Sequence, residues 1–501
     1  MKISSKSKKY FIKCGLLKFV GFAFFMLLLP DGLTYGQTVA REECTIGVAS
    51  GSATADGRPL LWKTRDYSSA PDNKVRYNTS HKYKFLSVTN ADSDLAWMGT
   101  NEQGFAIVNS LSRDLNSGLS GPGNGTLMRD ALGACKSVVD FQDYLDSTNV
   151  SGRRTQANFG VIDSSGAAAI FETGGNFYYK FDAKTAEHGY VIRTNFSESG
   201  GGSGGIERYK RSVVLIDDFH RGDTLHYKSL LRHQMRDFSD ENSHAVSVPY
   251  PDSWPGGAPY GYINCEKSIC RSSSVSAAVI HGILPGEHPG LTTMWVMLGQ
   301  PATTISLPYW PVGETPVEAG GYATSQLCDE ARSIKRLVFD YSGSNHFIDS
   351  YKLRDSDGNG LWSCLFPLED SVFSRTKRYM DSLRLLSSLP VHSILDTEGV
   401  NAAEALSHLQ ECRRSIAVDV NAVDSKELIS FYPNPADNKI YIDGCEESDI
   451  EVQIYDMNGR LLLHKILGER REVAVEFLAS GMYIIQITAN QKIHQLKLMK
   501  E

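Results

Sequence analysis

The segment 42–68 reads EECTIGVASGSATADGRPLLWKTRDYS and predicts a hairpin that begins close to a cysteine. The apolar, β-prone run TIGVAS follows Cys44, and PLLWKTRDY is the returning strand. The residues ADGR at 55–58 form the turn between them, because glycine tolerates the positive φ that hairpin turns need. Cys44 is then expected opposite the charged end of the second strand. Charge next to a thiol predicts a lowered pKa. The charged candidates are Lys63, Arg65 and Asp66.

A basic and then apolar leader precedes this hairpin. The run FVGFAFFMLLL at 19–29 follows a lysine-rich head. It is too short to span a bilayer, but it suits the core of a signal peptide. Small residues offer cleavage after Gly36 or Ala40. We therefore expect a signal peptide at 1–36, a short propeptide at 37–43 and an exported protein.

Length and charge restrict the possible classes. The 501 residues predict one large domain and at least one small one. The net charge of −7 is not the positive excess typical of nucleic-acid-binding proteins, so we expect no nucleic-acid partner. Past the leader, no apolar run is long enough for a stable membrane span.

An exported protein meets an oxidising compartment, so disulfides are expected, but the sequence does not give their pairing. Cys265 and Cys270 are close enough to close a small loop, yet the six cysteines between 135 and 412 allow fifteen pairings. Zinc-binding patterns such as Cys-x-x-Cys are lacking. The run DSDGNG at 355–360 begins like a calcium loop, but Phe366 stands where an EF-hand needs glutamate. We therefore expect a solvated turn there, and neither a metal nor another cofactor.

Cys44 has two interpretations. A structural cysteine is the ordinary one in an exported protein. The position of Cys44 favours a catalytic role, since it lies just past both cleavage points and begins the first strand. A cysteine at a processed N-terminus can use its own α-amino group, with a pKa of about 8, as the base.

The opening segment resembles the N-terminal nucleophile hydrolases of the acyltransferase and choloylglycine-hydrolase type. Within them it is similar to the peptidase C45 family, which includes acyl-coenzyme A:6-aminopenicillanic acid acyltransferase. The resemblance implies a four-layered αββα fold with Cys44 as nucleophile and Asp66 orienting its amine. Lys63 and Thr64 replace the family's arginine and asparagine. Arg65 is the alternative source of a guanidinium, although its side chain should face away from Thr64 and Asp66.

Further motifs follow in the family's order. The run GTNEQGFAIVN resembles a strand pair ending at Asn109, whose backbone N–H then helps bind the oxyanion. The Thr194-Asn195 pair matches a position whose asparagine amide donates to the oxyanion. Arg208 matches an arginine near the nucleophile. Outside this context, such an asparagine is usually a turn former and such an arginine a solvated helix residue.

Helical periodicity predicts three other segments. Residues 124–145 match the family's first helix, and 371–386 and 401–416 predict helices in a region without a recognisable motif. Between them, 157–173 predicts two strands around a turn at 163–166.

Near the C-terminus the residue pattern differs from that of the preceding region. Short alternating strands with turn punctuation predict a small β-sandwich. The stretches FYPNPADNKIYI, VQIYDMNGRLL and LASGMYIIQI resemble the type A C-terminal sorting domain of the type IX secretion system. The resemblance implies the secretion machinery as a partner, and a secreted or cell-surface location. It places the sorting domain at 430–501, after a linker at 416–429.

For the catalytic domain at 44–415 three functions stay open. The first is an exported amidohydrolase that cleaves a linear N-acyl amide, a small-molecule substrate, through an acyl-enzyme on Cys44. The second is an acyltransferase at the same site. The third is a surface binding protein without activity, which the changes at Lys63 and Thr64 favour.

Overall fold

The computed structural model describes residues 42–69, 71–118, 120–321, 323–339, 346–421, 430–443, 450–457, 459–468, 471–489 and 492–500. The expected signal peptide at 1–36 lies outside the described residues. So do residues 37–41 of the propeptide, 422–429 of the linker and Asn458 of an expected turn in the C-terminal module.

The predicted hairpin is present. Strand β1 (Glu42–Ala49) pairs antiparallel with β2 (Leu60–Tyr67), and Gly57 in the turn has a φ of 74°. The register places Cys44 opposite Arg65 and Glu43 opposite Asp66. The last two residues of the expected propeptide therefore continue the first strand rather than lying outside the sheet.

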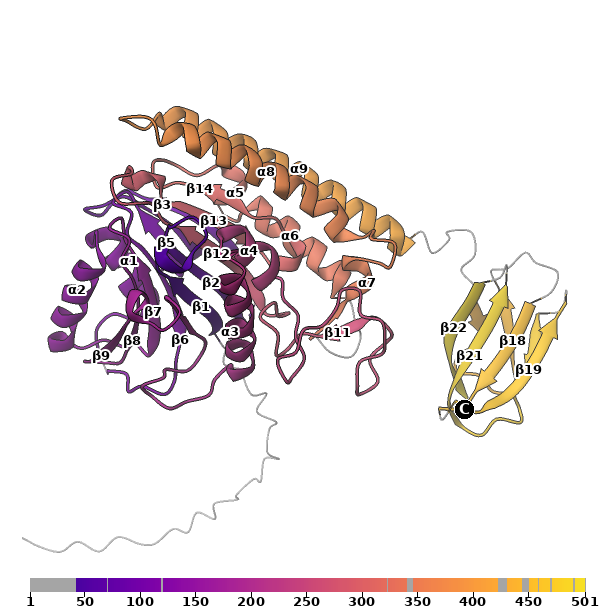
Figure 1. Cartoon of the computed structure of the whole chain (residues 1–501). Helices are drawn as coiled ribbons and strands as arrows, with labels where there is room; N and C mark the ends of the chain where they lie inside the picture. Colours follow the sequence, from indigo (N-terminus) through magenta and orange to yellow (C-terminus); the bar gives the residue numbers. More distant parts are fainter. Residues whose placement is uncertain are drawn as a thin grey trace, which may run out of the picture. The chain divides into compact units, whose positions relative to one another are not determined.

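This hairpin lies inside a six-stranded sheet. The strand order is β10-β1-β2-β12-β13-β14, and every pairing is antiparallel (Figure 1). The pairing of β12 with β2 brings a segment some 200 residues further along the chain beside the hairpin. The added strands are β10 (Tyr190–Arg193), β12 (Ser274–His281), β13 (Thr293–Leu298) and β14 (Leu307–Tyr309).

A second sheet of seven strands is a simple meander, β3 to β9 in chain order. Its strands β6 and β7 contact β1 and β2, so the two sheets pack face to face. Val48, Leu61 and Val108 lie in the resulting core. The strands are β3 (Asn73–Asn78), β4 (Phe85–Asn90), β5 (Met98–Asn101), β6 (Ala106–Leu111), β7 (Ala157–Ile162), β8 (Ala168–Thr173) and β9 (Tyr178–Asp182). The strand pair predicted around the turn at 163–166 is β7 and β8.

Two helices cover the other face of the seven-stranded sheet. They are α1 (Asn124–Ala134) and α2 (Val138–Ser151), so the expectation of one helix over 124–145 is wrong. The helix breaks because Ser137 starts a new one, where its hydroxyl accepts a hydrogen bond from the Asp140 N–H at 3.0 Å. Phe141 of α2 packs on Phe159 and Phe171 of the sheet.

Helices also pack on the six-stranded sheet. Helix α3 (Ile206–Arg221) contacts β10, the short α4 (Tyr227–Ser229) contacts β12, and α6 (Gln326–Val338) contacts β13. The mixed α+β class is therefore confirmed for this domain. A π-helical turn (Leu230–Gln234), α5 (Val317–Gly320), α7 (Ser350–Leu353), β11 (Tyr262–Asn264) and β15 (Phe347–Asp349) complete it.

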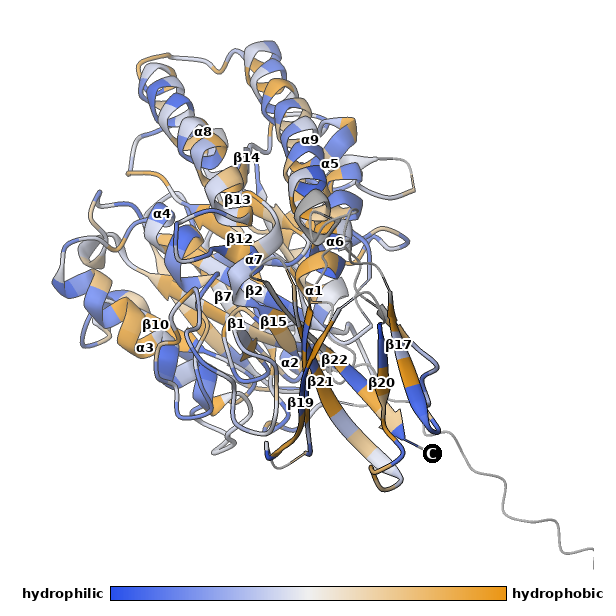
Figure 2. Cartoon of the chain, turned by 90° about the vertical axis from the view of Figure 1, so that its right-hand side faces the viewer, coloured by the Kyte–Doolittle hydropathy of each residue, from blue (hydrophilic) through white to orange (hydrophobic). Residues whose placement is uncertain are grey.

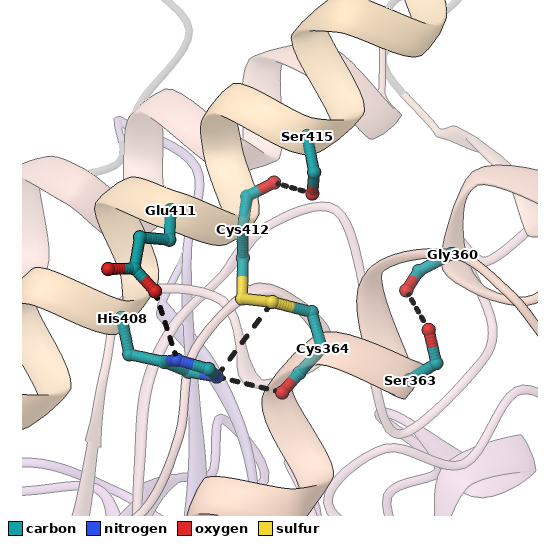
Figure 3. The surroundings of a disulfide bond; sticks show 7 residues. All are labelled: Gly360, Ser363, Cys364, His408, Glu411, Cys412 and Ser415. Carbon is teal, nitrogen blue, oxygen red and sulfur yellow. Dashed lines mark hydrogen bonds and ion pairs between the residues drawn. A yellow bond between two sulfur atoms is a disulfide. The ribbon is translucent and has the colours of Figure 1, made fainter.

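Two long helices, α8 (Leu361–Leu383) and α9 (Val391–Asn421), lie side by side (Figure 1). Both are longer than the helices predicted from periodicity. A disulfide between Cys364 and Cys412 joins them, and His408 lies against it (Figure 3). Cys265 and Cys270, the pair that is closest in sequence, are both buried free thiols. No helix in the described ranges has the length and apolar character needed to cross a membrane.

The C-terminal module is all-β, as predicted. It contains a three-stranded sheet, β16-β17-β20, and a four-stranded sheet, β19-β18-β21-β22. Buried and partly exposed residues alternate along β18, and Figure 2 shows alternating colours along β17. The strands are β16 (Ser430–Tyr432), β17 (Lys439–Asp443), β18 (Ile450–Tyr455), β19 (Leu461–Leu467), β20 (Glu472–Ala474), β21 (Gly481–Ala489) and β22 (Lys492–Lys500).

Candidate active site

Cys44 is fully buried on β1, and its own backbone is held on both sides. Its N–H donates a hydrogen bond to Asn195 Oδ1 at 3.1 Å. Strand β10 explains this contact, because it pairs with β1 only from Ile46 onward and ends at Arg193. Asn195 therefore follows the end of β10 and reaches the backbone of Cys44.

Arg208 binds the other side of the same backbone. Its Nη1 donates to the Cys44 carbonyl at 2.7 Å, and its Nη2 donates to Asn195 Oδ1 at 2.7 Å. The guanidinium is 3% exposed, so this sequence-predicted arginine is not a solvated helix residue. It packs against Gly205, which has a φ of 70° and where a Cβ would lie 2.4 Å from Arg208 Nη2. The glycine loop thus packs closely at the site.

Asp66 is buried at the end of β2, on the side of Arg208. The Ser274 hydroxyl donates to its Oδ1 at 2.6 Å, and its Oδ2 lies 3.8 Å from Arg208 Nη1 and 3.9 Å from Arg271 Nη1. Burial raises the pKa of Asp66, while Arg271 and Arg208 act in the opposite direction. In the unprocessed chain the Cys44 N–H bonds to Asn195 rather than to Asp66, so the amine-orienting role expected for Asp66 has no direct contact here.

Lys63 is the cation on the thiol side of the hairpin. Its Nζ donates to Asn109 Oδ1 at 2.7 Å and to the Trp97 carbonyl at 3.0 Å. Burial lowers the pKa of Lys63, and its interaction with Cys44 opposes that shift. This places a lysine ammonium next to the thiol, at the position where the resembled family has arginine.

Arg65 forms its contacts in another part of the core. Its Nη1 donates to the amide oxygens of Asn73 at 2.6 Å and Asn90 at 2.9 Å, and its guanidinium stacks over Trp97. Arg65 therefore lies on the face opposite Asp66, as strand alternation predicted. Lys63, not Arg65, is the cation positioned at Cys44.

Asn109 contributes more than the backbone N–H for which the sequence singled it out. Its side chain is fully buried on β6, and Oδ1 is occupied by Lys63. Among the described residues, Asn109 Nδ2 has no hydrogen-bond partner. A buried amide donor without a partner is costly unless a ligand uses it. The amide of Asn195 is different, because its Nδ2 already donates to the Leu111 carbonyl at 2.7 Å.

Burial dominates the pKa of the Cys44 thiol. Burial raises the pKa of Cys44 to about 11, although Lys63 and a hydrogen bond from the Asp66 backbone lower it. The expectation that neighbouring charge lowers this pKa is therefore wrong, because burial outweighs the attraction of Lys63. Glu42 adds to the rise through its negative charge.

The residues before Cys44 cover the site. Glu43 forms an ion pair with Arg271 and lies 3.6 Å from Arg208 Nη2. Beside this segment is a cavity of about 260 Å³. Its lining residues are Glu42, Glu43, Arg113, Asp114, Asn195, Gly202, Ser203 and Gly204.

Sequence reasoning missed Arg271 and Ser274. Both follow the run NCEKSIC and reach Asp66 only because β12 pairs with β2. It also missed Asn158, whose amide donates to the carbonyls of Thr194 and Phe196 and so fixes the segment that carries Asn195. No local motif marks these residues, since their positions depend on strand order.

A second polar cluster lies at the turn end of the hairpin. The ligand-type atoms of Asp56, His226 and His281 lie within 4.8 Å of one another, close enough to hold a metal ion. Asp56 Oδ2 is already 2.8 Å from His281 Nε2 and 3.6 Å from His226 Nε2. The cluster is therefore explained by one hydrogen bond, to His281, and one longer contact between carboxylate and imidazole, to His226.

Two family models match the chain. Residues 52–220 match acyl-coenzyme A:6-aminopenicillanic acid acyl-transferase, and residues 430–501 match a secretion system C-terminal sorting domain. Both resemblances noted in the sequence are thereby confirmed, and the sorting domain indicates export to the cell surface or outside. The first match includes Asp66, Asn109, Asn195 and Arg208, but it starts after Cys44. No curated protein matches the chain.

Three solved structures with similarity to the chain are each at most 13% identical to it. An N-acylethanolamine-hydrolyzing acid amidase ortholog from Caenorhabditis elegans is 13% identical, with a TM-score of 0.31, over 49% of this chain and 93% of that one. A variant of conjugated bile acid hydrolase from Clostridium perfringens is 11% identical, with a TM-score of 0.30, over 51% and 89%. Penicillin V acylase from Agrobacterium tumefaciens is 12% identical, with a TM-score of 0.29, over 53% and 85%.

Proposed function

We propose that this chain is an exported cysteine amidohydrolase that cleaves a linear N-acyl amide through a thioester on Cys44. One observation carries the proposal: the backbone of Cys44 is bound by Asn195 and Arg208 while Lys63 lies beside its thiol. A structural cysteine needs no such arrangement around its own N–H and carbonyl. We propose that the catalytic domain comprises residues 44–415.

The proposed enzyme must first release its own N-terminus. An acylated nitrogen is not basic, so Cys44 cannot supply a base while Glu43 is attached. The Cys44 thiol attacks the Glu43 carbonyl, a C–S bond replaces the C–N bond, and the proton passes to the freed nitrogen. Water then hydrolyses this thioester. The products are a chain that begins at Cys44 and a released peptide that ends at Glu43.

In the mature enzyme the same thiol attacks the substrate. The α-amine of Cys44 takes the thiol proton, and the thiolate adds to the amide carbonyl. The oxyanion is stabilised by the second Nδ2 hydrogen of Asn195, the one that does not bind the Leu111 carbonyl, and by the backbone N–H and side-chain amide of Asn109. Each donor contributes about 3 kcal/mol. The α-amine then protonates the leaving amine. Water hydrolyses the acyl-enzyme and restores the thiol.

The N-terminus of the mature protein tests this proposal. Wild-type protein is expected to begin at Cys44, and Cys44→Ala to keep the residues before position 44 and to lack amidase activity. Intact-mass measurement and an N-acyl amide panel give both readouts. Cys135→Ala is the matched control, because Cys135 is also a buried free thiol but lies at the end of α1. A wild-type protein that retains Glu43 and still hydrolyses amides would contradict the mechanism.

Acyl transfer to an amine is the second candidate, and the matched acyl-transferase model favours it. The two reactions share the acyl-enzyme and differ in what resolves it. Adding an acceptor amine to a turnover assay separates them, because a transferase forms a new amide at the expense of the free acid. A processed protein that forms neither product would instead fit a binding protein on this fold.

Export is proposed to use the type IX secretion machinery, with the segment 430–501 as its sorting signal. Deleting this segment is expected to retain the protein in the periplasm without unfolding the catalytic domain, since the segment has a hydrophobic core of its own. Cell fractionation and a melting curve of the truncated protein measure the two effects. Normal surface delivery of the truncated chain would refute the assignment.

A further inference from the structure

The segment that must leave the site carries two adjacent carboxylates. Glu42 and Glu43 are neighbours on β1, so their side chains point to opposite faces of the sheet. Each carboxylate therefore interacts with a different set of cations. Their removal changes the charge on both sides of Cys44 at once.

Glu43 contacts the arginines on the Asp66 side. Its carboxylate pairs with Arg271 and lies 3.6 Å from Arg208 Nη2. These arginine side chains are only 14% and 3% exposed. Asp66 lies 3.8 Å from Arg208 Nη1 and 3.9 Å from Arg271 Nη1, so it stays beside both arginines when Glu43 leaves.

Glu42 acts on the thiol side. Burial lowers the pKa values of Lys63 and Arg65, and the charge of Glu42 partly offsets that effect. Once the peptide is released, Arg208 and Arg271 keep Asp66 as a carboxylate neighbour, while Lys63 and Arg65 lose the charge of Glu42. Such cations are stabilised when an anion takes the vacated place.

We propose that Arg271 and Arg208 form a subsite for a carboxylate on the acyl group of the substrate, an inference that rests on the proposed function. Glu43 is the acyl donor when the chain cleaves itself, and its carboxylate already occupies this subsite. Three carbons separate its carbonyl from its carboxylate. A glutaryl amide has the same spacing and is the matching small substrate.

The test compares two acyl groups of equal length on the same leaving amine. Processed wild-type protein is assayed with the 4-nitroanilides of glutarate and pentanoate. The glutaryl amide is expected to show a kcat/KM at least about tenfold higher, because charge-assisted hydrogen bonds from arginine to a carboxylate are the strong ones. In Arg271→Met this ratio is expected to fall close to one, and Arg271→Lys should recover part of it.

Two controls separate this effect from others. Arg221→Met removes an arginine that is 72% exposed on α3 and should leave the ratio unchanged. Since Arg271 also binds Glu43, each variant is checked by intact mass and rates are normalised to processed protein. Calorimetry of glutarate against pentanoate measures the subsite without any chemistry, and Arg271→Met is expected to lose the glutarate preference.

The outcomes distinguish this inference from the proposed function. Equal rates for the two anilides, or faster cleavage of a pentanoyl amide that carries its carboxylate on the amine, would overturn the subsite and leave the amidase standing. Failure to cleave either anilide, with selective glutarate binding that depends on Arg271, would overturn the amidase and leave the subsite. Neither cleavage nor binding would overturn both.

Discussion

The two ends of the β1–β2 hairpin hold charged clusters that differ in where their partners come from. At the turn end, Asp56 interacts with His281, His226 and Arg58, and Arg58 also pairs with Glu287. At the Cys44 end, Arg271 pairs with Glu43, which also lies 3.6 Å from Arg208 Nη2 and directly precedes Cys44. Both clusters connect elements that are remote in sequence.

The difference separates a structural cluster from a reactive one. Charges that stabilise a fold are matched by partners that stay in place. At the Cys44 end some of the matching charge belongs to Glu42 and Glu43, which the proposed maturation removes. Substitutions at the Cys44 end should therefore change turnover, and those at the turn end should change stability.

The largest effect is expected from Asn195→Ala. Losing the amide removes an oxyanion donor and the group that binds the Cys44 nitrogen, so turnover should fall about a hundredfold or more with the fold intact. Steady-state kinetics on processed protein measure it, and circular dichroism checks the fold. Asn116→Ala, at an exposed loop position, is the matched control. An unchanged rate would remove Asn195 from the site.

Lys63→Met should lower turnover by about tenfold or more, because it removes the cation beside the thiol. Lys63→Arg should keep most of the rate. Arg65→Met, two residues along the same face, should lower the melting temperature and leave turnover within a few-fold of wild type. Rates and melting curves of the three variants decide the matter. Equal kinetic losses in Lys63→Met and Arg65→Met would contradict the separate roles assigned to them.

Asp56→Asn is expected to destabilise the fold by about 1–3 kcal/mol, since it weakens the hydrogen bond to His281 and removes the charge near His226 and Arg58. Turnover should stay within about threefold, because the turn lies at the far end of the hairpin. Chemical denaturation and an amidase assay measure the two quantities. A large loss of turnover with unchanged stability would mean that the turn end takes part in the chemistry.

The smallest effect concerns pH. Burial lowers the pKa of His281 more than Asp56 raises it, so the folded protein binds this proton less readily than the unfolded chain. Stability contributed by neutral His281 is therefore present above about pH 6.5 and is lost as pH falls below it. The free energy of unfolding, measured by chemical denaturation, should decline less from pH 7 to pH 5 in His281→Gln than in wild-type protein. Parallel curves would show that His281 does not titrate as described.

Local patterns in the sequence predicted the hairpin, its turn and the all-β tail. The three long helices were misjudged in length or continuity, because Ser137 divides one of them and tertiary packing extends the others. The order of motifs along the chain, compared with the resembled family, identified Cys44, Asp66, Asn195 and Arg208. The structure brings these four residues together. Arg271 and Ser274 could not be predicted, since strand pairing alone brings them to Asp66. The direction of the Cys44 pKa was wrong because the burial of this thiol in the folded sheet is not visible in a sequence.

The link between α8 and α9 has a consequence for survival outside the cell. The seven residues that join the helices include Leu385, which is 87% exposed, so this tip is open to proteases. A cut there would divide the chain, yet the Cys364–Cys412 bridge would still hold α9 to α8. Glu398 of α9 would also keep its hydrogen bond to the Trp310 N–H. A nicked molecule would thus stay assembled until its disulfide is reduced.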